Sequence, residues 1–173
     1  MDKQLVEGIH FSIMFYGGSL LCYLTGNDDE GNEELKEFIA LRRLNRNSVV
    51  VMDSDKTSTN DPVGDCKLRI KEEFKDDGLS WITAGRTIEN YLSADHRREA
   101  FLNVHRLSGE KVGGGGQFHT VKKGGGKFEK IKMARAAVSL PVNLDVLDLE
   151  ERINEMVKFI RKCNPNMDHV ATE

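Results

Sequence analysis

The chain has 173 residues, a net charge of −3 and an apolar content of 39%, which suits one globular domain with a sizeable core. No run approaches the roughly 18 apolar residues of a membrane span, and no signal peptide is visible, so a membrane-spanning or secreted protein is not expected. The three cysteines, Cys22, Cys66 and Cys163, have no CxxC spacing, so neither a zinc site nor a disulfide framework is indicated, and a reducing cytosol is the expected compartment.

Short apolar strands are expected to alternate with amphipathic helices along the chain. The expected elements, in order, are a strand over 9–16, the first turns of a helix over 19–24, a helix over 33–44, a strand over 49–52, a helix over 66–75, a strand over 79–83, a short helix or turn over 87–92, and helices over 95–104, 127–140 and 147–162. This order predicts an α/β fold, in which helices cover a parallel sheet. Three strands make a thin sheet, so either one strand escapes notice or the chain lacks a piece at its start.

The strand over 49–52 is followed by Asp53 and Asp55, two carboxylates spaced two residues apart. On a strand such residues point to the same side, so the two carboxylates would lie within roughly 7 Å of each other. Like charges this close repel, and the usual compensation is a divalent cation with oxygen ligands, Mg²⁺ or Mn²⁺. Ligands also collect at the carboxyl ends of strands in open α/β sheets. A turn explains the same residues, since aspartate and serine are good turn residues.

The strand over 79–83 is followed by Arg86 and Glu89. If the strands are parallel, Glu89 lies at the same edge of the sheet as the aspartate pair, where a third carboxylate would complete an oxygen-ligand set for one metal. Arg86 would pair with a phosphate or hold Glu89. A helix start explains Glu89 as well, because Thr87 would cap the helix and an acid is favoured in its first turn.

Basic residues are concentrated between Arg106 and Arg135, where eight lysines and arginines against two glutamates give a charge of +6 and leave −9 on the rest of the chain. A basic stretch beside an acidic site favours a polyanionic substrate such as nucleic acid, although a solvated loop followed by an ordinary charged helix is the alternative. Within it, 112–127 holds seven glycines in two runs without the GxxxxGK[ST] pattern. A flexible loop is therefore expected there rather than a phosphate cradle.

Two helices have apolar positions that predict how they pack. In the helix over 66–75 the residues expected to face inward are Leu68, Ile70 and Phe74. In the helix over 127–140 the expected buried stripe consists of Phe128, Ile131, Ala134 and Val138. Lys130, Lys132 and Arg135 cannot all share that stripe, so some of them face solvent or the site. A lysine near a metal-bound phosphodiester would neutralise charge in the transition state; a plain surface lysine is the alternative for each.

Three stretches, Leu5–Gly18, Met52–Lys56 and Gly85–Leu92, together resemble the Toprim nuclease domain of the OLD family (overcoming lysogenization defect) of ATP-dependent endonucleases. The helix Lys130–Arg135 resembles the lysine-bearing helix late in that domain. The resemblance covers residues 5–140. It implies a Toprim-like (Rossmann-like) fold, with a small parallel sheet flanked by helices, and DNA cleavage that depends on Mg²⁺ or Mn²⁺.

The resemblance also implies roles for particular residues. Asp53 and Asp55 match the family's paired aspartates, Glu89 matches a further acidic metal ligand, and Lys130 matches the helix-borne lysine. The metal would activate a water and stabilise the charge that develops on the phosphate, with Asp53 and Lys130 as the catalytic residues. The expected DNA contacts are Arg86, Lys122, Lys123, Lys132 and Arg135.

The first strand of the family pattern is where this chain departs from it. Toprim domains open with a strand that ends in a glutamate, followed three positions later by an acid, whereas Glu7 is followed three positions later by His10. We therefore expect the chain to begin downstream of that strand, to bind metal weakly and to cut poorly by itself. Residues 1–140 would form the Toprim-like core and 141–173 a C-terminal helix and tail. The expected partners are DNA and, because no Walker motif is present, an ATPase domain or subunit of the OLD type outside this chain; the oligomeric state is open.

Two other functions fit parts of the sequence. A degenerate Toprim module would bind DNA or a partner ATPase without cutting, as the missing glutamate strand and the basic helix favour. The stretch Asp53–Thr57 also fits the DxDxT loop of haloacid-dehalogenase-like phosphatases, with Asp53 as the nucleophile. That class needs a later acidic pair at the end of a strand, and the late acids of this chain sit in or before a helix instead.

Overall fold

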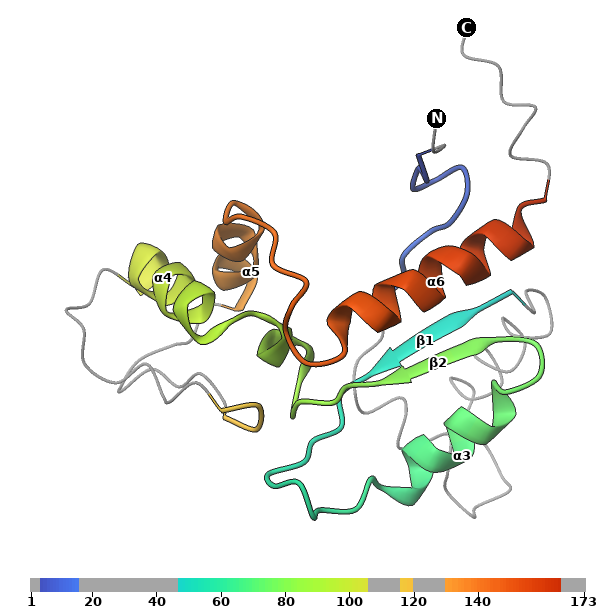
Figure 1. The fold of residues 1–173 in the computed structure, drawn as a ribbon, viewed down its shortest axis with the longest axis horizontal. Coiled ribbons are helices and arrows are strands. Elements are labelled where there is room, and N and C mark those ends of the chain that lie inside the picture. Colours follow the sequence, from blue (N-terminus) through green and yellow to red (C-terminus); the bar gives the residue numbers. More distant parts are fainter. Residues whose placement is uncertain (1–3, 16–46, 106–115, 120–129, 166–173) are drawn as a thin grey trace, which may run out of the picture. The chain divides into compact units, whose positions relative to one another are not determined.

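The computed structural model describes residues 4–15, 47–105, 116–119 and 130–165 (Figure 1). The elements expected over 19–24 and 33–44, together with Phe128, Lys122 and Lys123, lie outside the described residues. The chain divides into two compact units. The first consists of Met1–Val50, Gly64–Trp81 and Arg152–Glu173, and the second of Val51–Val63 and Ile82–Glu151.

Two strands, β1 (Val49–Met52) and β2 (Leu79–Ile82), pair in a parallel sheet (Figure 1). At one end the N–H of Leu79 donates to the carbonyl of Ser48 at 3.0 Å, and at the other the N–H of Thr83 donates to the carbonyl of Met52 at 2.9 Å. The residue offset is the same at both ends, as it must be when two strands run in the same direction. The described residues thus confirm an α/β fold and the parallel pairing expected for these two strands.

The strand expected over 9–16 is wrong for its described part, residues 9–15. The N–H groups of Ile9 and His10 both donate to the carbonyl of Val6, at 3.3 and 2.9 Å, and the N–H of Val6 donates to Nδ1 of His10 at 2.9 Å. These bonds close a turn. An apolar run becomes a strand only where a neighbouring strand satisfies its backbone groups, and this segment satisfies several of its own groups locally.

Helix α3 (Asp65–Glu73) connects the two strands, as expected. It has an acid, Asp65, in its first turn and ends before Phe74 and the turn that leads to Gly78. Ile70 and Phe74 are buried as predicted, but Leu68 is 47% exposed. The predicted inward position of Leu68 is wrong. Ile70 and Phe74 are four residues apart and share one face of the helix, whereas Leu68, two residues before Ile70, lies on nearly the opposite side.

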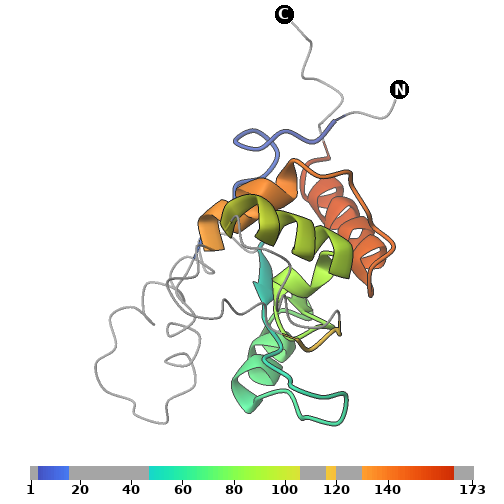
Figure 2. The ribbon, with the colours of Figure 1, turned by 90° about the vertical axis from the view of Figure 1, so that its left-hand side faces the viewer.

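Helices α4 (Ala94–His105) and α5 (Lys130–Val138) lie side by side in the second unit (Figures 1 and 2). Their contact is centred on three buried residues, Ala100, Phe101 and Met133. The partly buried residues packed around this centre are Val104, Ala136, Ala137 and Leu140.

The buried stripe predicted for α5 is therefore wrong. Ile131 is 71% exposed, Val138 is 86% exposed, and Ala134 is exposed as well. The sequence of α5 contains two stripes at helical spacing, and the helix packs on the one that begins at Met133. The alanines of that second stripe, Ala136 and Ala137, leave space for the side chains of α4.

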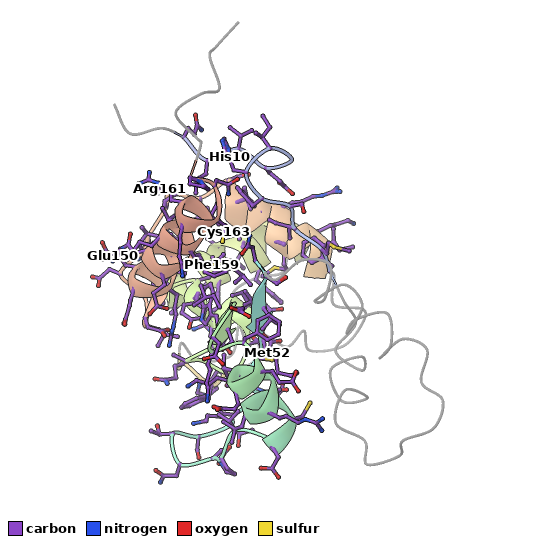
Figure 3. The ribbon with its side chains drawn as sticks, turned by 90° about the vertical axis from the view of Figure 1, so that its right-hand side faces the viewer. His10, Met52, Glu150, Phe159, Arg161 and Cys163 are labelled. Carbon is purple, nitrogen blue, oxygen red and sulfur yellow. The ribbon has the colours of Figure 1, made fainter. Side chains whose placement is uncertain are left out.

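Helix α6 (Leu149–Cys163) follows the expected 147–162 closely and is strongly amphipathic. Figure 3 shows Glu150 and Arg161 on one side of the helix and Phe159 and Cys163 on the other. Acids occupy its first turn and bases its last turn, and these charges interact favourably with the helix dipole at both ends. Just past the end of α6, Nδ2 of Asn164 donates to the carbonyl of His10 at 3.0 Å. Among the helices of the described residues, none combines the length and the apolar composition that crossing a bilayer requires.

Candidate functional site

The loops that follow β1 and β2 are joined by two buried hydroxyl side chains, those of Ser54 and Thr83. The N–H of Ser54 donates to Oγ1 of Thr83 at 2.8 Å, and both hydroxyls donate to the carbonyl of Gly85, at 2.7 and 2.8 Å. Buried polar groups are costly unless paired, so these bonds stabilise one arrangement of the two loops. All the residues of this junction, and of the site built on it, belong to the second unit.

The side chain of Asp53 connects the same two loops. Its Oδ1 accepts a 2.8 Å hydrogen bond from the N–H of Ile88, the first residue of the 3₁₀ helix η1 (Ile88–Tyr91). A carboxylate at this position pairs a backbone N–H that the helix leaves without an internal partner, and it carries negative charge at the favourable end of the helix. The side chain predicted as a metal ligand therefore has a structural role as well.

Asp55 lies on the same loop, with its backbone in the left-handed region at φ 58°. Its N–H donates to the carbonyl of Arg86 at 2.9 Å, which again ties the loop after β1 to the loop after β2. Because β1 ends at Met52, neither Asp53 nor Asp55 is in a strand. The expectation that strand geometry places both carboxylates on one side is therefore wrong, although aspartate is one of the few residues that adopts the left-handed region readily.

Glu89 is half-buried in the first turn of η1. The N–H and the hydroxyl of Thr87 both donate to Oδ1 of Asn90, at 2.9 and 3.2 Å, and these bonds close the start of the helix. The helix-start explanation for Glu89 is thus confirmed at the level of the backbone. The hydrogen bonds that close the helix start do not involve the carboxylate of Glu89, so its role as a metal ligand stays a prediction.

The loop that continues from Asp55 is held by Asp61. Its carboxylate accepts hydrogen bonds from the hydroxyl and N–H of Thr57, at 2.6 and 2.7 Å, and from the hydroxyl and N–H of Ser58, at 2.7 and 3.0 Å. These bonds, those from the Thr57 hydroxyl foremost, hold the pKa of the Asp61 carboxyl well below its ordinary value. The loop bonds therefore persist at neutral pH and are lost only in acid, as the pH falls through that lowered pKa.

The three predicted metal ligands carry the oxygen donors that Mg²⁺ prefers, but their positions do not match a site with three protein ligands. Within residues 4–15, 47–105, 116–119 and 130–165, no group of three or more His, Cys, Asp or Glu side chains is placed to hold a metal ion. Mg²⁺ keeps several waters and is commonly held by one or two carboxylates together with substrate phosphates. Asp53 with Asp55 or Glu89 is a donor set of that kind, so the residues present fit a hydrated divalent cation.

The predicted basic residues lie on different parts of the second unit. Arg86 is half-buried beside the aspartate loop. Lys130 is the first residue of α5, and Lys132 and Arg135 are exposed on that helix. The structure therefore brings the backbone of Arg86 against the loop that carries Asp55, and it places the other three residues on a separate element of the same unit.

A buried tyrosine at the end of η1, Tyr91, also holds this helix in place, and the sequence patterns did not single it out. The hydroxyl of Tyr91 accepts a hydrogen bond from the N–H of Ala84 at 3.0 Å and donates to the carboxylate of Asp148. Tyr91 is the last residue of η1, and Asp148 directly precedes α6. This hydroxyl therefore ties the loop that carries Arg86 and Glu89 to a segment far away in the sequence.

Tyr91→Phe is expected to lower the free energy of unfolding by about 1–2 kcal/mol, because it leaves the N–H of Ala84 and the carboxylate of Asp148 without this partner. Urea denaturation of Tyr91→Phe, Asp148→Ala and the double variant measures the effect as a thermodynamic cycle. We expect the double variant to lose less stability than the two single losses together. Strictly additive losses would show that the two side chains do not interact.

Comparisons with protein-family models, with curated proteins and with solved structures gave no match to this chain.

Proposed function

We propose that this chain is a Toprim-type domain that hydrolyses DNA phosphodiesters with Mg²⁺ or Mn²⁺. The observation that carries the proposal is the hydrogen bond from the N–H of Ile88 to Oδ1 of Asp53. It holds together the two loops at the carboxyl ends of parallel strands, the place where α/β proteins bind ligands. Asp53, Asp55 and Glu89 would then lie on two loops that are held together at one edge of the sheet.

The carboxylate of Asp53, together with that of Asp55 or of Glu89, would hold the divalent cation, with water completing its coordination. When bound, the cation supplies a water that deprotonates near neutral pH and stabilises charge on the phosphoryl oxygens. Hydrolysis of the phosphodiester would add the oxygen of one water to phosphorus and break one P–O ester bond, with one of that water's protons passing to the departing oxygen and the other to solvent. The negative charge of the three carboxylates also explains why a polyanionic substrate would need the metal in order to approach.

Arg86 would bind the phosphate in this proposal. Its backbone is held on both sides, because its carbonyl accepts the N–H of Asp55 and its own N–H donates to the carbonyl of Gln117 at 3.0 Å. A guanidinium that starts from a fixed backbone can present two parallel N–H groups to a phosphate. Lys130, Lys132 and Arg135 on α5 would contribute positive charge for the DNA backbone, and Lys130 is the candidate for neutralising transition-state charge.

A second candidate function is a DNA-binding module that does not cut. One observation favours it: in the described parts of the chain no three acidic or metal-binding side chains gather as a ligand set. In that case Asp53 would serve only to pair the N–H of Ile88.

Incubation of the chain with supercoiled plasmid and Mn²⁺, Mg²⁺ or a chelator separates the two functions. We expect nicked circles with either metal and none with the chelator, since no carboxylate pair can stabilise a phosphate anion without a cation. DNA binding without nicking, in protein that folds normally, would favour the second function. Hydrolysis of a phosphomonoester such as p-nitrophenyl phosphate without nicking would point to the phosphatase alternative.

A further inference from the structure

The segment Gly116–His119, here called the docked turn, is anchored against the loop after β2 although glycine runs flank it on both sides in the sequence. The N–H of Arg86 donates to the carbonyl of Gln117 at 3.0 Å, and Nε2 of Gln117 donates to the carbonyl of Ala84 at 3.2 Å. The sequence predicts a flexible loop over 112–127, whereas these hydrogen bonds hold its described part, Gly116–His119, in place. Ordering a glycine-rich segment costs conformational entropy, so these bonds must offset that cost.

Asn90 supplies the third anchor. Its side chain is only 3% exposed, and it uses both ends of its amide. Oδ1 accepts from Thr87, which closes η1, while Nδ2 donates to the carbonyl of His119 at 2.9 Å. A single buried side chain therefore fixes both the helix that carries Glu89 and the docked turn.

The packing at the backbone of Gly85 shows how tight this contact is. A Cβ added to Gly85 would lie 2.8 Å from the carbonyl oxygen of Gln117 and 2.6 Å from Cβ of Asn90. Real Cβ atoms do not approach other heavy atoms so closely, so the docked turn lies directly against the loop. Because the carbonyl of Arg86 accepts from Asp55 while its N–H donates to Gln117, three segments stand side by side at the site.

We infer that the docked turn is a third wall of the site and that the imidazole of His119 contacts the phosphate backbone of bound DNA; this inference rests on the proposed function. His119 is exposed, and the N–H of His119 closes the turn on the carbonyl of Gly116 at 3.0 Å. An imidazole donates a hydrogen bond to a phosphate oxygen in either of its protonation states. In this arrangement Asn90 is a positioning residue that acts through His119.

Binding of a fluorescein-labelled DNA duplex, with Ca²⁺ in place of Mg²⁺ and at fixed salt, tests the role of His119. We expect His119→Ala to weaken binding about 3- to 10-fold, the range of one ordinary hydrogen bond of about 1 kcal/mol. His119→Gln, which keeps a neutral donor, should recover most of that loss. The matched control His96→Ala on α4 should bind within about twofold of the unchanged chain. Equal binding by His119→Ala and the unchanged chain would overturn the inference alone, whereas no binding by the unchanged chain would overturn the proposed function with it.

Asn90→Asp tests the anchoring step without reference to activity. The carboxylate still accepts from Thr87, but it cannot donate to the carbonyl of His119 and repels it. We expect the amide of Arg86, which binds Gln117, to lose about tenfold in hydrogen-exchange protection, while the amide of Thr83, which binds Met52, keeps its protection. DNA binding should weaken as in His119→Ala. Unchanged protection at Arg86 would show that Asn90 does not hold the docked turn.

Discussion

Asp53→Asn is expected to reduce metal-dependent nicking of plasmid DNA by about 100-fold or more while the chain stays folded. Asparagine keeps an oxygen that can accept the hydrogen bond from the N–H of Ile88, so the link between the two loops survives. It removes the negative charge that a divalent cation requires from its ligand. The change therefore separates the metal role of Asp53 from its structural role, and the measurement is the rate of nicking at saturating Mn²⁺.

Two further variants control this result. Asp53→Ala should lose nicking to the same extent and should also lose stability, about 0.5–1.5 kcal/mol, because the exposed N–H of Ile88 exchanges its carboxylate acceptor for water. Asp76→Asn, a matched change at an exposed turn residue after α3, should nick DNA within about twofold of the unchanged chain. Full nicking activity in Asp53→Asn would rule out Asp53 as a metal ligand and leave it only the pairing of η1.

Gly85→Ala is expected to lower the free energy of unfolding by about 2–3 kcal/mol and to displace the docked turn. The added methyl would meet Cβ of Asn90 at 2.6 Å and the carbonyl oxygen of Gln117 at 2.8 Å, and it would also approach Cδ1 of Leu147 at 3.2 Å. The carbonyl oxygen belongs to the backbone and cannot move aside without breaking the hydrogen bond from the N–H of Arg86. Urea denaturation measures the loss of stability, and hydrogen exchange at the amide of Arg86 reports the displacement.

Gly64→Ala provides the matched control, because nothing lies within 4 Å of a Cβ added there and its φ of −59° suits any residue. Its effect should stay within about 1 kcal/mol, since alanine serves the start of α3 less well than glycine but restricts the unfolded chain more. Equal stability of Gly85→Ala and Gly64→Ala would mean that the docked turn is not packed against Gly85 as described.

The elements that sequence patterns predicted well are those whose signal is local. β1 and β2 are short apolar runs bounded by polar turns, and α6 has an apolar side at helical spacing with acids first and bases last. The position of the acidic residues after both strands follows from the same patterns. Their hydrogen bonds do not, because the partner of Asp53 is 35 residues away and the partner of the Asn90 Nδ2 group is 29 residues away.

The sequence by itself determined the α/β class, two strands, the helices of the described parts, and the acids that follow the strands, because these depend on residue type and spacing over a few positions. Only the tertiary structure decided that α5 packs on the stripe of Met133 rather than that of Ile131, and that Arg97 is buried while the adjacent Arg98 is exposed. It also decided that Ser54, between the two aspartates, is buried and joins the loops together with Thr83. Burial and hydrogen bonding depend on which distant neighbour is present, and a local pattern carries no information about that neighbour.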